Sequence, residues 1–436
     1  MNLKKAIKKA VPLKVKEFIV KRKISLIENF MILTINHKHE KALKKVKAKT
    51  KIKVAFFVIH SSVWKYDILY KLFDDNERFE PIIVICPYIT NGQAIMLKEM
   101  ELSYNFFENK NYKIKKTYNE ATDEWLDVKA IIQPDIVFFT NPHNLTRKEY
   151  YITNWQDTLT CYVPYGFKVS HLYKFHFDLL FQNLLWKFFL ETDTHQTLSI
   201  KISRNQGRNT LVTGYPGMDT FLVKDYVPND VWKIKNKNIK RIIWAPHHTI
   251  SGKGVGLDYS TFLDYCWFML ELASRYKDKI QISFKPHPIL RSKLNESDVW
   301  GKIKTDQYYE TWKNLENGQL DESDYMDLFM TSDAMIHDSG SFLVEYLYTG
   351  KPVMFLVNDD NITDRFNEIG KKAFDHLYLG KGISEINEFI EGTVINEIDI
   401  KEANRISFFK SLIKPPNDVT ASENIYNSII DQIENK

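Results

Sequence analysis

The order of apolar and polar residues predicts alternating strands and helices over most of this 436-residue chain. Short apolar runs, typical of buried strands, alternate with longer stretches in which apolar residues recur at helical spacing. Such alternation is typical of an α/β fold, in which parallel sheets carry helices on both faces. The clearest strand-like runs are residues 54–59, 81–86, 135–139, 160–163, 241–244, 280–284, 334–336 and 353–357.

The same pattern divides the chain into four parts. A polar stretch rich in lysine and asparagine, residues 227–240, separates two series of strands. We therefore expect one Rossmann-like domain over residues 51–225 and a second over residues 226–400. A helical arm over residues 1–50 precedes them, and helices over residues 401–436 follow and pack near the domain junction.

The aromatic-rich stretch 171–190 is expected to be a buried helix beneath the cleft between the two domains. The stretch is dense in aromatic residues, and a cofactor-binding motif is not expected there.

Charge is concentrated in the arm. Residues 1–53 carry 17 Lys/Arg and three Glu, whereas the whole chain has a net charge of +5, so the remainder is net negative. Apolar residues recur every three or four positions between the lysines, a pattern typical of a helix that lies in an anionic membrane surface. A lysine face in solvent, with the arm packed on its own protein, is the other interpretation. Because the body is acidic, we expect no nucleic-acid partner.

Other features narrow the class of protein. No apolar run approaches the length of a transmembrane helix, and we expect no signal peptide. Three widely spaced cysteines indicate neither a disulfide framework nor a cysteine metal site, so a reducing compartment is expected.

The stretch 332–355 predicts a strand, a small-residue turn, a helix and a second strand. Backbone N–H groups at the start of such a helix favour a diphosphate. Ser339 and Ser341 add hydroxyl donors, and Glu345 lies one turn later, where a carboxylate can bridge two ribose hydroxyls. An ordinary capped helix is the alternative.

Two more strands of the same domain end in basic turns, residues 245–249 (APHHT) and 285–288 (KPHP). Because parallel strands end at one edge of a sheet, these turns should meet the serine turn. A diphosphate suits this set better than a metal, since Asp338 is the one nearby carboxylate and no HxxxH spacing occurs. We expect no metal and no cofactor. The basic side chains are His247, His248, Lys285, His287 and His337.

Strands of the first domain also end in turns with proton-accepting side chains. His60 follows the first strand, His143 lies in a later turn, and Tyr165 lies in the sequence Pro164-Tyr165-Gly166. With His171 they are candidates for a base that takes the proton from an acceptor hydroxyl.

These motifs resemble a known family. WAPHHT (244–249), FKPHP (284–288) and the stretch 332–355 resemble the C-terminal domain of CDP-glycerol glycerophosphotransferases, the primases and polymerases of teichoic acids and related capsule polymers. TGYPGMD (213–219) resembles the turn that ends their first domain. The resemblance covers roughly residues 130–360. It implies the GT-B fold, two facing Rossmann-like domains with the donor in the second and the acceptor in the first.

The resemblance also implies a reaction. Glycerol phosphate, or a related alditol phosphate, would pass from a CDP-activated donor to the hydroxyl of a lipid-linked or polymer acceptor, with release of CMP. The protein would be peripheral, at the cytoplasmic face of the cell membrane. The site residues it implies for the donor are His337, Asp338, Ser339, Gly340 and Ser341 around the diphosphate, Lys285 and His287 on the phosphates, and Glu345 on the ribose.

The chain departs from the family in two turns. The family often has Trp-His-Gly, whose histidine is the presumed base, where this chain has Pro164-Tyr165-Gly166. His247 and His248 stand where the polymerases tend to have Thr and Arg, and are expected to stabilise the transferred phosphate. Two other functions stay open: a GT-B nucleotide-sugar glycosyltransferase of capsule synthesis, and a non-catalytic membrane scaffold that binds no nucleotide.

Overall fold

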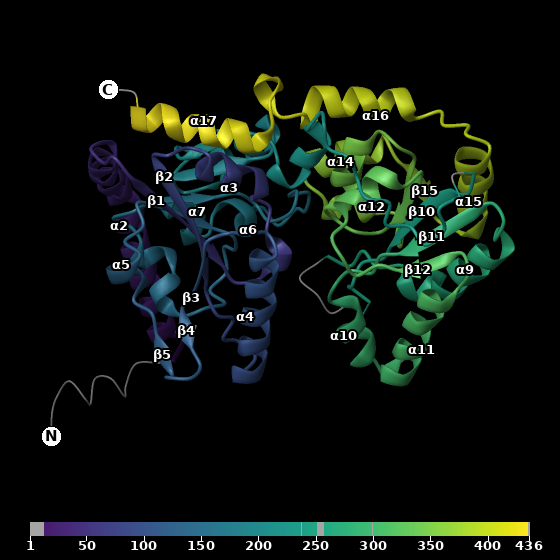
Figure 1. The fold of residues 1–436 in the computed structure, drawn as a ribbon, viewed down its shortest axis with the longest axis horizontal. Helices are drawn as coiled ribbons and strands as arrows, with labels where there is room; N and C mark the ends of the chain where they lie inside the picture. The colour runs from purple at the N-terminus through teal and green to yellow at the C-terminus, as the bar shows by residue number, and fades with distance from the viewer. Residues whose placement is uncertain (1–12, 237, 251–256, 299, 435–436) are drawn as a thin grey trace.

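Two parallel sheets with helices packed around them form the body of the protein (Figure 1). The structure is a computed structural model that describes residues 13–236, 238–250, 257–298 and 300–434. The predicted α/β class, with two Rossmann-like units and a basic helical arm, is confirmed.

The first sheet has the strand order β3-β2-β1-β6-β7-β8-β9. All its neighbouring strands are parallel, and the direction of the order reverses between β1 and β6. Ligands of open α/β sheets bind beyond the strand ends at such a reversal. The strands are β1 (Ile52–Val58), β2 (Phe79–Ile85), β3 (Ile114–Lys116), β6 (Ile136–Phe139), β7 (Leu159–Tyr162), β8 (Lys187–Leu190) and β9 (Thr210–Val212); β4 (Tyr118–Asn119) and β5 (Glu124–Trp125) form a separate antiparallel pair.

The second sheet has the order β12-β11-β10-β13-β14-β15, and its direction reverses between β10 and β13. Ala245 and His337, the last residues of those two strands, are register partners, so the turns that follow leave the sheet side by side. The strands are β10 (Lys240–Ala245), β11 (Ile280–Phe284), β12 (Gly318–Leu320), β13 (Ala334–His337), β14 (Val353–Leu356) and β15 (Tyr378–Gly380).

Helices join the strands of each unit. The predicted helix after the serine turn is present as α13 and a following 3₁₀ turn, and it ends at Gly350, whose φ of 70° suits glycine. The first unit has α3 (Asp67–Asp74), α4 (Gln93–Glu108), α5 (Val128–Ile131), α6 (Tyr173–Phe177), α7 (Leu180–Leu184) and α8 (Asp193–Ile202). The second has α9 (Phe262–Arg275), α10 (Leu290–Asn295), α11 (Gly301–Asn314), α12 (Met326–Thr331), α13 (Phe342–Glu345), α14 (Glu368–Phe374), α15 (Ile383–Glu388) and α16 (Glu402–Phe408).

The stretch 171–190 is not the single buried helix that its aromatic residues predict. It forms the short helices α6 and α7 and then strand β8, which pairs between β7 and β9. The prediction was wrong because Leu179 and Leu185 have extended backbones that interrupt the helical run.

The arm is one long helix, α2 (Leu13–Lys47), on the side of the first unit that faces away from the second (Figure 1). Ile32, Ile35, Ala42 and Val46 in its second half are buried against the body. No helix in the described part of the chain is long and apolar enough to cross a membrane.

The C-terminus returns to the first unit. Helix α17 (Ala421–Glu434) buries Ile425, Ile429 and Ile433 in the core of the first sheet, whereas α16 lies over the second sheet (Figure 1). The Asp219 carboxylate accepts hydrogen bonds from the first backbone N–H groups of α17, at 2.7 and 2.8 Å. The chain therefore crosses the junction between the two units twice.

Candidate functional site

Three turns converge at the strand reversal of the second sheet. Strand β10 lies between β11 and β13, and the His287 N–H donates to the Pro246 carbonyl, at 3.1 Å, so the turns after β10 and β11 are joined. The imidazole rings of His247, His248 and His287 have centroids 4.3–5.2 Å apart. Residues from two separate sequence motifs thus form one cluster.

Neighbouring groups decide which nitrogen of these histidines carries the proton. The Thr249 hydroxyl accepts hydrogen bonds from the two N–H groups of residues 259–260, at 3.0 and 3.2 Å, so its own proton points to Nδ1 of His247, 3.0 Å away. Nδ1 of His287 accepts from the Ile289 N–H, at 3.2 Å. In both neutral rings the proton therefore lies on Nε2.

His337, at the end of β13, has the same tautomer. Its Nδ1 accepts from the Ser339 N–H, at 3.1 Å, and its buried Nε2 has no protein partner in the described part of the chain. Burial lowers the pKa of His287 and of His337 to about 3, and lowers that of His247 well below its ordinary value. Near pH 7 all three rings are therefore neutral Nε2–H donors.

The positions of the protons on these rings determine which kind of ligand the cluster can bind. Side-chain nitrogens of His247, His248 and His287 lie within 4.8 Å of one another, close enough for one metal ion. A metal needs the lone pair of a nitrogen, however, and in His247 and His287 the Nδ1 lone pair is already used while Nε2 carries a proton. The cluster fits an anionic group such as a phosphate better than a cation.

Asp338 holds the cluster in place. Its fully buried carboxylate accepts from the backbone N–H of His247 and from the N–H and hydroxyl of Thr261, the hydroxyl at 2.8 Å. Burial raises its pKa to about 6, while these hydrogen bonds act to lower it. The sequence predicts that Asp338 contacts the donor. In the structure its carboxylate fixes the turn that carries His247. A direct contact with the donor stays a prediction.

The serine turn lies against the first unit. A Cβ at Gly340 would approach Tyr259 to 3.3 Å and Val169 to 3.8 Å, so the backbone is close-packed there. Ser341, at the start of α13, has a hydroxyl that makes no hydrogen bond within the described part of the chain. Ser339 is buried and Ser341 is partly exposed. Their contact with a diphosphate stays a prediction.

The Lys285 ammonium makes its hydrogen bonds within the second unit. Its Nζ lies 3.0 Å from the Asp321 carboxylate and also donates to the Ser323 carbonyl. The ion pair is buried, with the lysine side chain 8% exposed. A phosphate contact, as predicted, would require this ammonium to share or leave Asp321.

Glu345 joins the two units. Its Oε1 accepts from the backbone N–H of Phe167 in the first unit, at 3.1 Å, and its Oε2 accepts from the Tyr325 hydroxyl, at 2.8 Å. Lys65 of the first unit donates to the same hydroxyl, at 3.2 Å. Glu345 is buried, with 1% of the residue exposed. The predicted bond to a ribose would require one of these contacts to open.

Three of the four candidate bases lie near the junction. The rings of Tyr165 and His143 are 6.4 Å apart, and Nζ of Lys168 lies 3.8 Å from the Tyr165 ring centroid. Burial lowers the pKa of His143, and the Lys168 charge lowers it further. Nδ1 of His171 lies 2.9 Å from the Arg365 carbonyl, so that nitrogen donates and Nε2 is left as an acceptor.

His60, the fourth candidate, follows β1 at the reversal of the first sheet. Its Nδ1 lies 2.9 Å from the Glu99 carboxylate, and its ring packs on Tyr88. A carboxylate at Nδ1 fixes the ring and leaves Nε2 free to accept a proton. Among the four candidates, as described, His60 alone has such a partner.

Several residues of the site could not be identified from the sequence. Lys65 and Tyr325 lie outside every motif, and only folding brings them together across the junction. Thr261 and Asp321 are ordinary polar residues at element ends. Thr249 is part of the APHHT turn, but the sequence did not show that its hydroxyl decides the tautomer of His247.

Comparisons with known proteins show which family the chain matches. The profile of the family described as CDP-Glycerol:Poly(glycerophosphate) glycerophosphotransferase matches residues 168–431. Over 172 residues the chain is 28% identical to the teichoic acid ribitol-phosphate polymerase TarL of Staphylococcus aureus, a stretch that covers 36% of this chain and only 27% of that polymerase.

Solved structures share the fold. A structure of the wall teichoic acid polymerase TagF matches over 98% of this chain and 99% of its own, with a TM-score of 0.58 and 14% identity. A UDP-N-acetylglucosamine 2-epimerase matches over 89% of this chain and 98% of its own, with a TM-score of 0.54 and 14% identity. At these identities the likeness concerns the fold alone.

Proposed function

Because this chain belongs to the CDP-glycerol:poly(glycerophosphate) glycerophosphotransferase family, and is therefore a transferase, we propose that it transfers glycerol phosphate or a related alditol phosphate. The donor is CDP-activated, the acceptor is a hydroxyl in teichoic acid or capsular polysaccharide synthesis, and CMP is released. The observation that carries the proposal is the cluster of His247, His248 and His287 at one strand reversal, in which His247 and His287 are Nε2–H donors. A structure of TagF soaked with CDPG supports the donor class.

The proposed chemistry is an in-line displacement at the β-phosphorus. The acceptor oxygen forms a bond to that phosphorus as the bond to the CMP oxygen breaks, and negative charge builds on the phosphoryl oxygens and on CMP. Fixed N–H donors in a buried site stabilise such charge without reorganising. His247, His248 and His287 are proposed to serve this purpose.

A base of the first unit takes the proton of the acceptor hydroxyl. His60 is the favoured candidate because Glu99 orients it, and His143, Tyr165 and His171 remain the others. Substitution His60→Gln is expected to lower kcat by about 10²–10⁴-fold, because the glutamine amide cannot accept a proton. His37→Gln, at an exposed position of the arm, is the matched control. Unchanged kcat in His60→Gln would transfer the role to another candidate.

One observation favours a second function. Tyr165 stands where the family often has the presumed catalytic histidine, so the chemistry at that turn differs. A glycosyltransferase of the same fold would use the same nucleotide site but attack an anomeric carbon instead of phosphorus.

Product analysis separates these functions. The protein is incubated with CDP-glycerol or a UDP-sugar and a lipid-linked or polymer acceptor, and released nucleotides are measured with the extended acceptor. Acceptor-dependent release of CMP with a new phosphodiester supports phosphoalditol transfer. Release of UDP with a new glycoside would replace it by glycosyl transfer.

The place of action is proposed to be the cytoplasmic face of the cell membrane, with the protein as a peripheral component. The net positive arm and the lipid-linked or polymer acceptor of the proposed reaction support this location.

A further inference from the structure

One basic side chain of the first unit reaches across the junction to the second. Lys65 lies in the loop between β1 and α3, which also carries His60, at the strand reversal of the first sheet. Its Nζ donates to the hydroxyl of Tyr325 in the second unit, at 3.2 Å, and lies 4.8 Å from the centroid of that ring. An ammonium group of one unit is therefore held against the site of the other.

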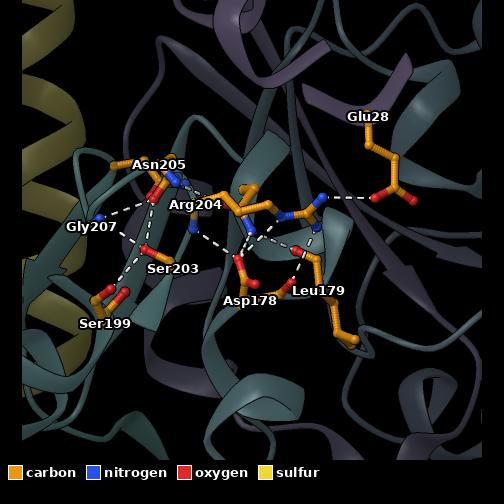
Figure 2. A network of polar contacts seen from close by, with 10 residues as sticks. Glu28, Asp178, Leu179, Ser199, Ser203, Arg204, Asn205 and Gly207 are labelled. Atoms are coloured by element: carbon orange, nitrogen blue, oxygen red, sulfur yellow. Dashed lines mark hydrogen bonds and ion pairs between the residues drawn. The ribbon is translucent and has the colours of Figure 1, made fainter. Parts of the chain in front are cut away.

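The Lys65 ammonium has no charged partner. Arg204, a partly exposed cation of the same unit, lies between two carboxylates, 2.7 Å from that of Glu28 and 3.3 Å from that of Asp178 (Figure 2). Lys65 is also partly exposed, but within the described part of the chain no carboxylate forms an ion pair with it. Burial raises the pKa of Tyr325 well above its ordinary value, so the phenol is neutral. A shielded cation with a neutral partner favours an anionic ligand.

Tyr325 connects this ammonium to the carboxylate that is expected to bind the ribose. The Tyr325 hydroxyl accepts from Lys65 and donates to Oε2 of Glu345, at 2.8 Å, so Nζ lies two hydrogen bonds away from that oxygen. A ribose bound at Glu345 brings its own 5′-phosphate to this side of the junction. Lysine binds phosphate as a point charge on a flexible stem, so a small movement of the side chain is enough for contact.

A structural link between the units is the other explanation for Lys65. Glu345 already provides such a link, because its buried carboxylate accepts from the Phe167 N–H of the first unit, at 3.1 Å. Lys65 adds one bond to a neutral hydroxyl, and a charge held by a neutral group recovers little of its desolvation cost. A link alone therefore does not explain why a cation stands at this position.

We infer that Lys65 is a residue of the nucleotide site that the first unit supplies, and that its ammonium leaves the Tyr325 hydroxyl to bind the 5′-phosphate of the ribose held by Glu345. The nucleotide is then held by both units, and the loop that carries His60 is fixed beside it. The inference deepens the proposed function and rests on it for a nucleotide at Glu345. It does not depend on which group is transferred.

The difference between a nucleotide and its nucleoside isolates the phosphate contact. Binding of CMP and of cytidine is measured by calorimetry, in competition format for the weaker ligand. Lys65→Met should bind CMP at least about tenfold more weakly, because a charge-assisted hydrogen bond is lost, and should bind cytidine as before. Lys65→Arg should keep most of the affinity for CMP. Arg204→Met, which removes a cation paired inside the first unit, is the matched control and should bind CMP normally.

Acetylation of the unaltered protein tests the same contact without a substitution. Acetic anhydride modifies accessible lysines, and mass spectrometry of the peptides gives the rate at each one. Saturating CMP should slow the acetylation of Lys65 several-fold, and cytidine should not. Lys71, an exposed lysine of α3, is the internal control and should react at one rate in all samples. Equal rates at Lys65 with and without CMP would overturn the inference.

The remaining outcomes separate the inference from the proposed function. Equal weakening of CMP and cytidine in Lys65→Met, or the same weakening of CMP in Arg204→Met, would show a structural role and contradict the phosphate contact. Binding of UMP that depends on Lys65, with no binding of CMP, would remove the CDP-activated donor but leave the contact standing. Binding of neither nucleotide would overturn both.

Discussion

Histidine chemistry in this site is decided by neighbours at the scale of single residues. The Nδ1 atoms of His247, His287 and His337 are all hydrogen-bonded by donors that follow them closely in sequence. The sequence therefore contained the cause, in the turns APHHT, KPHP and HDSGS. It did not reveal the result, because a tautomer depends on the turn geometry and on burial.

His337 should make stability depend on pH. Its pKa is about 3 in the folded protein and ordinary, near 6.5, in the unfolded chain, so acid protonates only the unfolded chain. The free energy of unfolding then falls as the pH drops below 6.5, by about 2 kcal/mol at pH 5. His337→Gln keeps an acceptor for the Ser339 N–H but cannot titrate.

Denaturant unfolding at pH 7.5 and pH 5 measures this effect. The stability difference between His337→Gln and the unaltered protein should shift in favour of the variant by about 2 kcal/mol at the lower pH. Parallel pH curves for the two proteins would contradict the assignment of a neutral, buried imidazole.

Glu345 should matter for the junction. In Glu345→Gln one amide oxygen can still accept from Phe167 or Tyr325, but the amide N–H₂ faces a group that also donates. We expect a loss of about 1–2 kcal/mol in the free energy of unfolding. Glu368→Gln, which changes an exposed carboxylate that accepts from Tyr173 across the same junction, should cost less than about 0.5 kcal/mol. Equal effects would show that the buried contact is not a link between the units.

At the scale of elements, local patterns predicted the strands and turns that surround the site. The run 332–355 became β13, α13 and β14 as expected, because apolar period, small-residue turn and Gly-Pro punctuation agree there. The stretch 171–190 failed because its apolar content suits both a helix and a central strand. Pairing with β7 and β9 decided the outcome for β8, and such pairing is not local information.

Lys351 of the Gly-Lys-Pro sequence is expected to stabilise the end of α12 and to take no part in the transfer reaction. Its Nζ donates to the carbonyls of Phe329, Met330 and Ser332 at the C-terminal end of α12. Lys351→Met should lower the free energy of unfolding by about 2–3 kcal/mol, because a charge at the helix terminus is lost and three carbonyl oxygens lose their donor. Thermal unfolding beside Lys372→Met, an exposed lysine of α14, checks this. Equal melting temperatures of the two variants would contradict it.

At the scale of the whole molecule, two sheets with the same kind of strand reversal are joined by a chain that crosses between them twice. Alternation of strands and helices was enough to predict this class. The contacts across the junction were not predictable, since Lys65, Phe167, Tyr325 and Glu345 are far apart in sequence and share no motif. For the same reason the sequence offered four bases, and only the folded protein pairs His60 with Glu99.

The measurement that tests the account most directly is nucleotide binding by calorimetry, with CDP-glycerol, CDP-ribitol, CMP, UDP and UDP-sugars. The account predicts that cytidine diphosphate ligands bind, and that His287→Ala weakens them at least about tenfold by removing a partly buried donor, while His37→Ala does not. Preference for uridine ligands would assign the site to glycosyl transfer. Equal binding by His287→Ala and the unaltered protein would contradict the histidine donor site itself.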